Sequence, residues 1–294
     1  MNIQSYDIPL GISITAYPPE AVNDFVDNGF TCFEVGIPAT LPGVECQYQH
    51  YDYSPEVTAA AAIRAGRGRE DELVALKQPL ADAIMSRKLR VWSVHLPFGA
   101  GWDIAHWVES EREAVCRSLM RIMDITAAWG PRVFVLHGCL EPVSDAERPV
   151  RVARSILSMR ELDEHARRLG ARVALEDLPR SCLANCSLET RAMAQAAGDV
   201  PICFDVNHLL GESHESFLNA LASQVVTTHL SDYDGVDERH WLPGEGIVPW
   251  KRILDGLMEA GYRGPFLFEL RTGEDGPYDA RTVLDCFKRA LSAK

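Results

Sequence analysis

Acidic and imidazole side chains recur in this sequence at the ends of short apolar runs. Four of them end successive runs in the second half of the chain: Glu176, Asp205, His229 and Glu269. Carboxylate oxygens with one imidazole suit Mn²⁺, Mg²⁺, Co²⁺ or Zn²⁺, and no thiolate biases the set toward a soft metal. Without a cation, clustered carboxylates would repel one another. The residue types therefore predict one divalent metal ion, with Mn²⁺ the first candidate.

Other polar residues end further runs or follow them closely. Those expected to contact a substrate are His95, His137, His208, His240 and Arg271. A single histidine at such a place is more often a hydrogen-bonded structural residue, so the interpretation depends on the whole set. Asp177 and Asp232 are expected to orient a ligand or to cap a loop rather than to bind the metal.

Three of these features have structural alternatives. Arg271 could bind a carboxylate or phosphate of the substrate, or form a salt bridge that neutralises the acidic residues around it. His208 could donate to a substrate oxygen or form a structural hydrogen bond with the loop after the seventh strand. The turn Gly244-x-Gly246 could cradle a phosphate through backbone N–H groups, or it could be a tight loop before a helix. The sequence leaves each pair open.

Apolar runs rich in β-branched residues alternate with longer amphipathic ones along the whole chain. Near-continuous apolar strands are typical of a parallel sheet covered on both faces. Eight alternations predict an α/β fold, a single (β/α)₈ TIM barrel over residues 1–294, and no Gly-x-Gly-x-x-Gly follows the first strand. The predicted strands are Leu10–Ala16, Thr31–Gly36, Arg90–His95, Arg132–His137, Arg172–Glu176, Pro201–Asp205, Val225–His229 and Pro265–Glu269.

A barrel would bring the polar residues together, because catalytic groups project from the carboxyl ends of its strands. Seven of the eight predicted strands deliver a carboxylate or an imidazole to that rim, Glu34 among them. Residues 38–68 form an irregular insertion after the second strand, expected to lie over the barrel mouth as a lid or partner surface. Pro79 is expected to kink the helical segment that follows the insertion.

The composition limits the class of partner. The net charge is −13 and no Lys/Arg-rich run is present, which disfavours nucleic acid. No stretch has the roughly 18 apolar residues of a membrane span, and no leader peptide is visible. The eight cysteines are scattered, and Cys182 and Cys186 lack a second pair that would complete a zinc site. We therefore expect a reduced, cytoplasmic protein without a membrane partner.

Six stretches carry a resemblance to a known family: Val94–Pro97, Ala174–Asp177, Cys203–His208, Thr228–Asp232, Leu242–Gly246 and Phe268–Arg271. Together they resemble the xylose isomerase-like TIM-barrel superfamily. The resemblance implies a sugar or sugar-phosphate isomerase or epimerase with a carbohydrate substrate, in which one metal stabilises an enediolate while Glu176 and Glu269 move the proton. A keto-sugar or keto-inositol dehydratase on the same site is the alternative. Relatives often pair, so a homo-oligomer is expected.

One position departs from the epimerase branch. His240 stands where ketose 3-epimerases carry an arginine, and the local pattern looks more like endonuclease IV, whose Asp-x-His binds further zinc ions. Glu238 would replace that aspartate, and His95 and His137 match other zinc ligands. A phosphoesterase with additional Zn²⁺ is therefore the second enzyme class. An accessory subunit and a barrel that binds sugar without turnover are the non-enzymatic alternatives.

Overall fold

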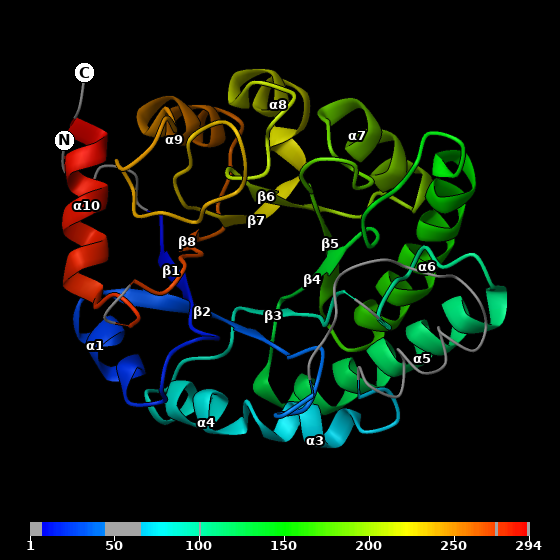
Figure 1. Cartoon of the computed structure of the whole chain (residues 1–294). Coiled ribbons are helices and arrows are strands. Elements are labelled where there is room, and N and C mark those ends of the chain that lie inside the picture. The colour runs from blue at the N-terminus through cyan, green and yellow to red at the C-terminus, as the bar shows by residue number, and fades with distance from the viewer. Residues whose placement is uncertain (1–7, 45–65, 100, 274–275, 293–294) are drawn as a thin grey trace.

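Eight parallel strands form one sheet in the order β7-β6-β5-β4-β3-β2-β1-β8 in a computed structural model, which describes residues 8–44, 66–99, 101–273 and 276–292. A parallel bridge between Leu230 and Phe268 joins the two outer strands of that order and closes the barrel. The predicted TIM barrel is confirmed (Figure 1). The strands are β1 (Leu10–Ser13), β2 (Phe30–Gly36), β3 (Ser93–His95), β4 (Val133–His137), β5 (Arg172–Glu176), β6 (Ile202–Asp205), β7 (Val225–His229) and β8 (Phe266–Phe268).

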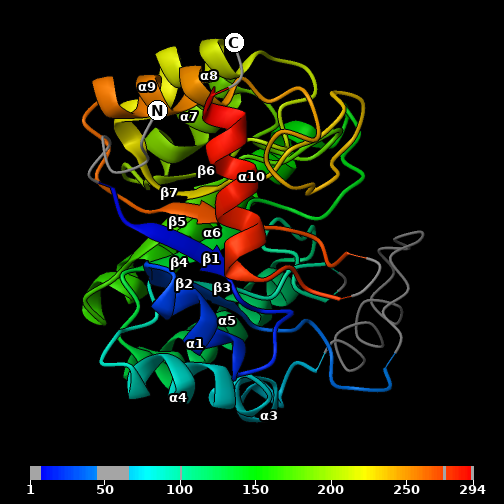
Figure 2. The same cartoon turned by 90° about the vertical axis from the view of Figure 1, so that its left-hand side faces the viewer.

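Helices lie around the outside of the strands (Figures 1 and 2). Helix α10 packs against the barrel through Phe287, whose ring meets Phe268 of β8 with centroids 5.0 Å apart. The helices are α1 (Ala21–Asp27), α3 (Glu70–Ala75), α4 (Gln78–Ser86), α5 (Glu109–Thr126), α6 (Arg148–Arg168), α7 (Ser187–Ala196), α8 (His214–Leu221), α9 (Trp250–Glu259) and α10 (Ala280–Ser292). Every helix in the described ranges is too short or too polar to cross a membrane.

The strand register aligns the polar residues at one rim. His137 lies beside Glu176 across the β4–β5 pair, and Asp205 lies beside His229 across the β6–β7 pair. Beneath them, inside the barrel, a small apolar layer packs together: Val133, Val135, Ala174 and Cys203. The polar residues at neighbouring strand ends therefore lie close together, above an apolar layer.

Some boundaries differ from the sequence prediction. β1 ends at Ser13 and β3 begins only at Ser93, although the backbones of Ile14 and Trp92 still donate hydrogen bonds to β2, at the Glu34 and Phe33 carbonyls. Pro79 does not kink a helix but lies in the first turn of α4, where its missing N–H costs no hydrogen bond. Most of the predicted insertion, residues 45–65, lies outside the described residues.

Candidate active site

The four predicted metal ligands converge at the carboxyl end of the barrel. His229 Nδ1 lies 3.1 Å from Glu176 Oε1, 3.1 Å from Glu269 Oε2 and 3.9 Å from Asp205 Oδ2. One ligand atom from each residue falls within 4.8 Å of all the others. Three of the side chains are fully buried or nearly so, and that of Glu269 is 29% exposed. The group is therefore compact and open on one side.

Glu34 sets the orientation of the histidine. Its carboxylate lies 3.1 Å from His229 Nε2 and accepts a 2.8 Å hydrogen bond from Ser93 Oγ. Nε2 is thereby occupied, which leaves Nδ1 to face the other three carboxylates. The sequence placed Glu34 at the rim but did not assign it this contact. Its position at the end of β2, like the other rim residues, was the available signal.

Asp232 caps a loop and does not orient His229. Its carboxylate accepts hydrogen bonds from the backbone of Gly244 at 2.8 Å and Val248 at 3.0 Å, and from Trp250 Nε1 at 3.0 Å. A Cβ on Gly246 would come within 2.0 Å of the Tyr233 carbonyl oxygen, so this close approach requires glycine. Of the two alternatives for the turn Gly244-x-Gly246, a phosphate cradle or a tight loop, these contacts favour the tight loop.

The donor chemistry of the four residues fits a divalent cation. Asp205 Oδ2 is buried among them without a hydrogen-bond partner. Burial raises the pKa of Asp205 to about 6, because it removes the charged carboxylate from water. Burial also raises the pKa of Asp177 well above its usual value, and its Oδ1 accepts a hydrogen bond from the Asp205 backbone at 2.8 Å. Asp177 thus supports the strand end, as predicted for a loop cap.

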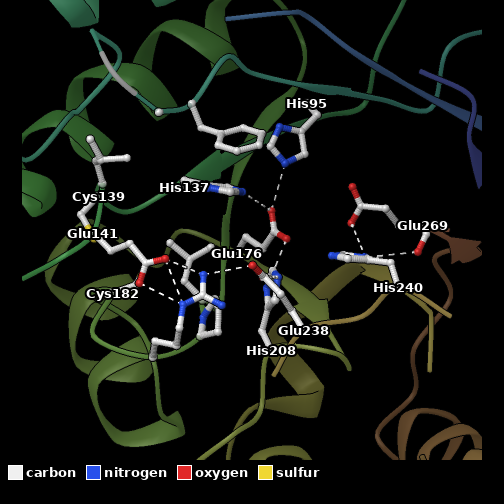
Figure 3. A pocket seen from close by; sticks show the side chains of 16 residues that line it. His95, His137, Cys139, Glu141, Glu176, Cys182, His208, Glu238, His240 and Glu269 are labelled. Carbon is white, nitrogen blue, oxygen red and sulfur yellow. Dashed lines mark hydrogen bonds and ion pairs between the residues drawn. The ribbon is translucent and has the colours of Figure 1, made fainter. Parts of the chain in front are cut away.

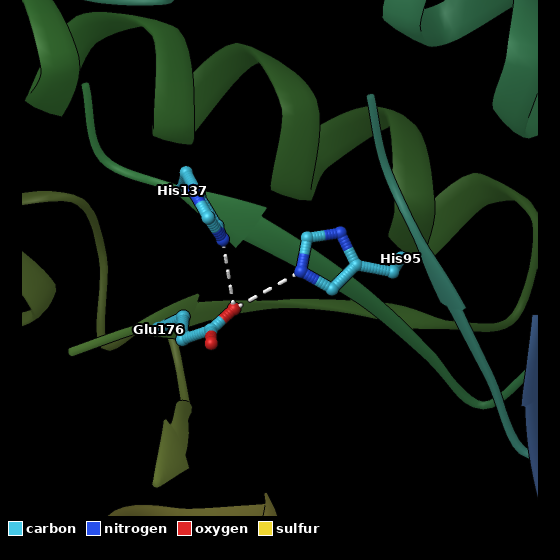
Figure 4. Close-up of side chains that lie close together, drawn as sticks. All are labelled: His95, His137 and Glu176. Carbon is cyan, nitrogen blue, oxygen red and sulfur yellow. Dashed lines mark hydrogen bonds and ion pairs between the residues drawn. The ribbon is translucent and has the colours of Figure 1, made fainter. Parts of the chain in front are cut away.

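Glu176 faces two groups at once. Its Oε1 points to His229, while its Oε2 lies 3.1 Å from His95 Nε2 and 3.2 Å from His137 Nε2 (Figure 4). Burial opposes protonation of His95, but the contact with Glu176 raises its pKa to about 9. Burial lowers the pKa of His137. His95, His137 and Glu176 form a second set of potential metal ligands.

A third set joins His208 and His240 to Asp205. His208 Nδ1 donates to the Asp177 carbonyl at 2.8 Å, and Nε2 lies 3.2 Å from Glu238 Oε2. The contact with Glu238, in the loop after β7, matches the structural alternative for His208. The bond to Asp177, in the loop after β5, was not foreseen. His240 has a left-handed backbone, with φ of 52°, and its Nδ1 lies 3.9 Å from Glu269 Oε2.

These residues open into a cavity of about 440 Å³ (Figure 3). Four of the five predicted substrate-binding residues line it: His95, His137, His208 and His240. Arg271 does not. Its guanidinium lies over the Trp241 ring, 5.7 Å from the centroid, so its contact with a substrate stays a prediction. The sequence analysis missed several residues that line this cavity, among them Phe98, Glu141 and Arg180.

Comparison with known proteins identifies the family. The family described as Xylose isomerase-like TIM barrel matches residues 22–290. The chain belongs to this family. Fructoselysine 3-epimerase of Escherichia coli O157:H7 is 29% identical over 145 residues, which are 46% of this chain and 52% of that protein. The Shigella flexneri enzyme of that name matches equally, over 51% of its length. The chain thus spans about half the length of these curated relatives.

Solved structures share the fold over nearly the whole chain. A 3-keto-D-glucoside 4-epimerase from E. coli has a TM-score of 0.68 at 18% identity, covering 97% of this chain and 100% of that one. L-ribulose 3-epimerase has a TM-score of 0.69 at 16% identity, covering 97% and 95%. At such identities the likeness concerns the fold of this xylose isomerase-like barrel and not its substrate.

Proposed function

We propose that the chain is a metal-dependent sugar epimerase or isomerase that moves a proton at the carbon next to a carbonyl group. The observation that carries the proposal is the position of Glu176 and Glu269, each 3.1 Å from the same nitrogen of His229. The names of the curated relatives, fructoselysine 3-epimerases, support the same reaction class. So do the names of the structural neighbours.

Glu176, Asp205, His229 and Glu269 would hold the ion. When bound, a divalent ion would lower the cost of the negative charge that develops as a carbon-bound proton leaves. Mn²⁺ is our first candidate, and Mg²⁺, Co²⁺ and Zn²⁺ also suit this ligand set. The orphaned Asp205 Oδ2 supports this assignment.

The two glutamates would carry the proton. Burial opposes their ionisation, but His229 lowers the pKa of both, so both are ionised at neutral pH and able to accept a proton. Glu176 ends β5 and Glu269 follows β8, so the side chains reach the sugar from different parts of the rim. One removes the proton and the other returns it, which inverts the carbon; return to the neighbouring carbon gives isomerisation.

The test is exchange of carbon-bound hydrogen in D₂O. We expect the metal-loaded protein to introduce deuterium next to the carbonyl of a ketose or keto-sugar, as followed by NMR. Glu176→Gln and Glu269→Gln should each lower the rate by about 10²- to 10⁴-fold, the usual contribution of a general acid or base. Glu164→Gln, at an exposed carboxylate on α6, is the matched control. Unchanged exchange in both active-site variants would contradict the mechanism.

A multi-metal phosphoesterase is the second candidate function. It is favoured by two of the three further ligand sets, those of His95, His137 and Glu176 and of Asp205, His208 and His240, each of which includes two histidines. The number of metal ions per chain separates the two functions. Two or three zinc ions, together with hydrolysis of a phosphodiester, would favour the phosphoesterase.

A further inference from the structure

The cavity extends beyond the carboxylates to a second group of residues, which has no part in the proposed proton transfer. We call this group the outer wall: Phe98, Leu140, Glu141, Leu178, Pro179 and Arg180. Figure 3 shows the two ends, with His240 and Glu269 on one side of Glu176 and Glu141 on the other. The outer wall and the carboxylates line the same cavity, so one ligand can contact both. Four residues of this wall are apolar: Phe98, Leu140, Leu178 and Pro179.

Phe98 is an exposed aromatic residue at the boundary of the two ends. Its side chain is 43% exposed, and its ring stacks on His137 with centroids 4.1 Å apart and 26° between the planes. His137 in turn contacts the Oε2 of Glu176 at 3.2 Å. The rest of the Phe98 surface is left for a ligand, and aromatic faces in cavities commonly contact apolar groups and sugar rings.

Arg180 is the only lysine or arginine among the described residues that line this cavity, and its donors are already used. Its Nε donates to Glu141 at 3.0 Å, its Nη1 to Asp237 at 2.7 Å and its Nη2 to Glu238 at 3.0 Å. Three carboxylates surround this one guanidinium, and two of them, Glu141 and Glu238, line the cavity itself. A phosphate here would meet repulsion and would have to displace an existing partner.

The glycine turn offers no substitute phosphate site. The backbone N–H groups of Gly244 and Val248 already donate to Asp232. Those of Leu242 and Ile247 donate to Glu245 and to the Tyr233 carbonyl. A phosphate cradle needs several N–H groups that point outward together, and four of this loop already donate within it: those of Leu242, Gly244, Ile247 and Val248.

We propose that the outer wall is a subsite for an uncharged, apolar group attached to the sugar, so that the substrate is a glycoside of a keto-sugar and not a sugar phosphate. The inference rests on the proposed function for the position of the sugar carbonyl at the carboxylates. The attached group then lies over Phe98 and against Leu140 and Leu178. Burial of apolar surface there would supply affinity that a free monosaccharide lacks.

The test measures binding, so it does not depend on turnover. Isothermal titration calorimetry on the metal-loaded protein compares three probes with one carbonyl position: 3-keto-D-glucose, its 6-phosphate and its phenyl β-glycoside. We expect the phenyl glycoside to bind at least tenfold more tightly than the free sugar, and the phosphate to bind more weakly than the free sugar. Tighter binding of the phosphate, or no binding of any probe, would overturn the proposal.

Variants of the wall show where the preference arises. Phe98→Ala and Leu140→Ser should each reduce the glycoside-to-free-sugar affinity ratio at least threefold; both side chains are partly exposed, so the fold should tolerate the changes. Glu141→Gln should raise the affinity for the phosphate severalfold, because it releases donors of Arg180. An unchanged ratio in both wall variants, or no gain for the phosphate, would contradict the assignment.

Deuterium exchange on the same probes separates this subsite from the proposed reaction. A glycoside preference without any exchange would leave the subsite in place and refute the epimerase or isomerase. Exchange with a preference for the phosphate would support the reaction and refute the subsite.

Discussion

Buried carboxylates occur in two different settings in this barrel. In the scaffold they meet arginine: Asp103 lies 2.6 Å from Arg151, and both side chains are almost fully buried. At the rim, the described ion-pair partners of Glu176 and Asp205 are all histidines, and Asp205 Oδ2 accepts no hydrogen bond in the described part of the chain. A guanidinium cancels a buried charge permanently, whereas imidazoles and an orphaned oxygen leave room for a cation from outside. The contrast indicates which acids stabilise the fold and which serve the site.

The largest expected effect is at the rim. Asp205→Asn should lower turnover at least about 10³-fold, which corresponds to about 4 kcal/mol, because the ion would lose a ligand. The metal-free protein should keep its melting temperature or gain slightly, because an unpaired buried carboxylate is removed. Turnover and thermal unfolding of the chelator-treated protein measure the two effects. A large loss of stability in the metal-free Asp205→Asn variant would show instead that Asp205 stabilises the fold.

Arg151→Met, in contrast, should lower the stability of the fold. It leaves Asp103 buried without its partner, and breaking a buried pair costs about 3–5 kcal/mol of unfolding free energy. Arg117→Met, at an exposed pair with Glu113, is the matched control and should change stability by less than about 1 kcal/mol. Urea unfolding measures both. Equal effects of the two substitutions would break the distinction between buried and surface pairs.

Metal removal should destabilise the protein only through the loss of the ion from the four ligands at the rim. A ligand that binds only the folded state stabilises it by about 2.7 kcal/mol at a hundredfold excess over Kd. Chelation should therefore lower the melting temperature of the wild type and leave that of Asp205→Asn almost unchanged. Equal shifts in the two proteins would show that the chelator acts elsewhere.

The pH dependence of stability tests a second buried carboxylate that is paired with arginine, Asp163. Burial opposes its ionisation, but hydrogen bonds from Arg172, Arg167 and the Val173 backbone lower its pKa. Its stabilisation is therefore fully present above its unfolded pKa of about 4 and is lost as the pH falls through the lower folded value. Asp163→Asn should cost about 1–3 kcal/mol at pH 7. The difference in unfolding free energy between the variant and the wild type should become smaller at acid pH. A difference that does not change with pH would contradict the assignment.

The fold and the meeting of the four strand-end residues could be predicted from sequence, because a regular strand-helix alternation fixes which ends share a rim. The contact of Glu34 could not be predicted, and the sequence left two roles open for Asp232. Both end or follow a strand in the same way, and only closure of the barrel shows that Glu34 faces His229 while Asp232 faces a loop. The pairing of Arg180 with Glu141 likewise joins separate loops whose packing leaves no periodic signal.

Metal content per chain, by plasma mass spectrometry on protein purified without chelator or affinity metal, tests the central claim most directly. We predict about one divalent ion per chain in the wild type, its loss in Asp205→Asn, and its retention in Glu164→Gln. A metal-free wild type, or full retention in Asp205→Asn, would contradict the account. Two or three zinc ions per chain would contradict the single-ion site and favour the phosphoesterase.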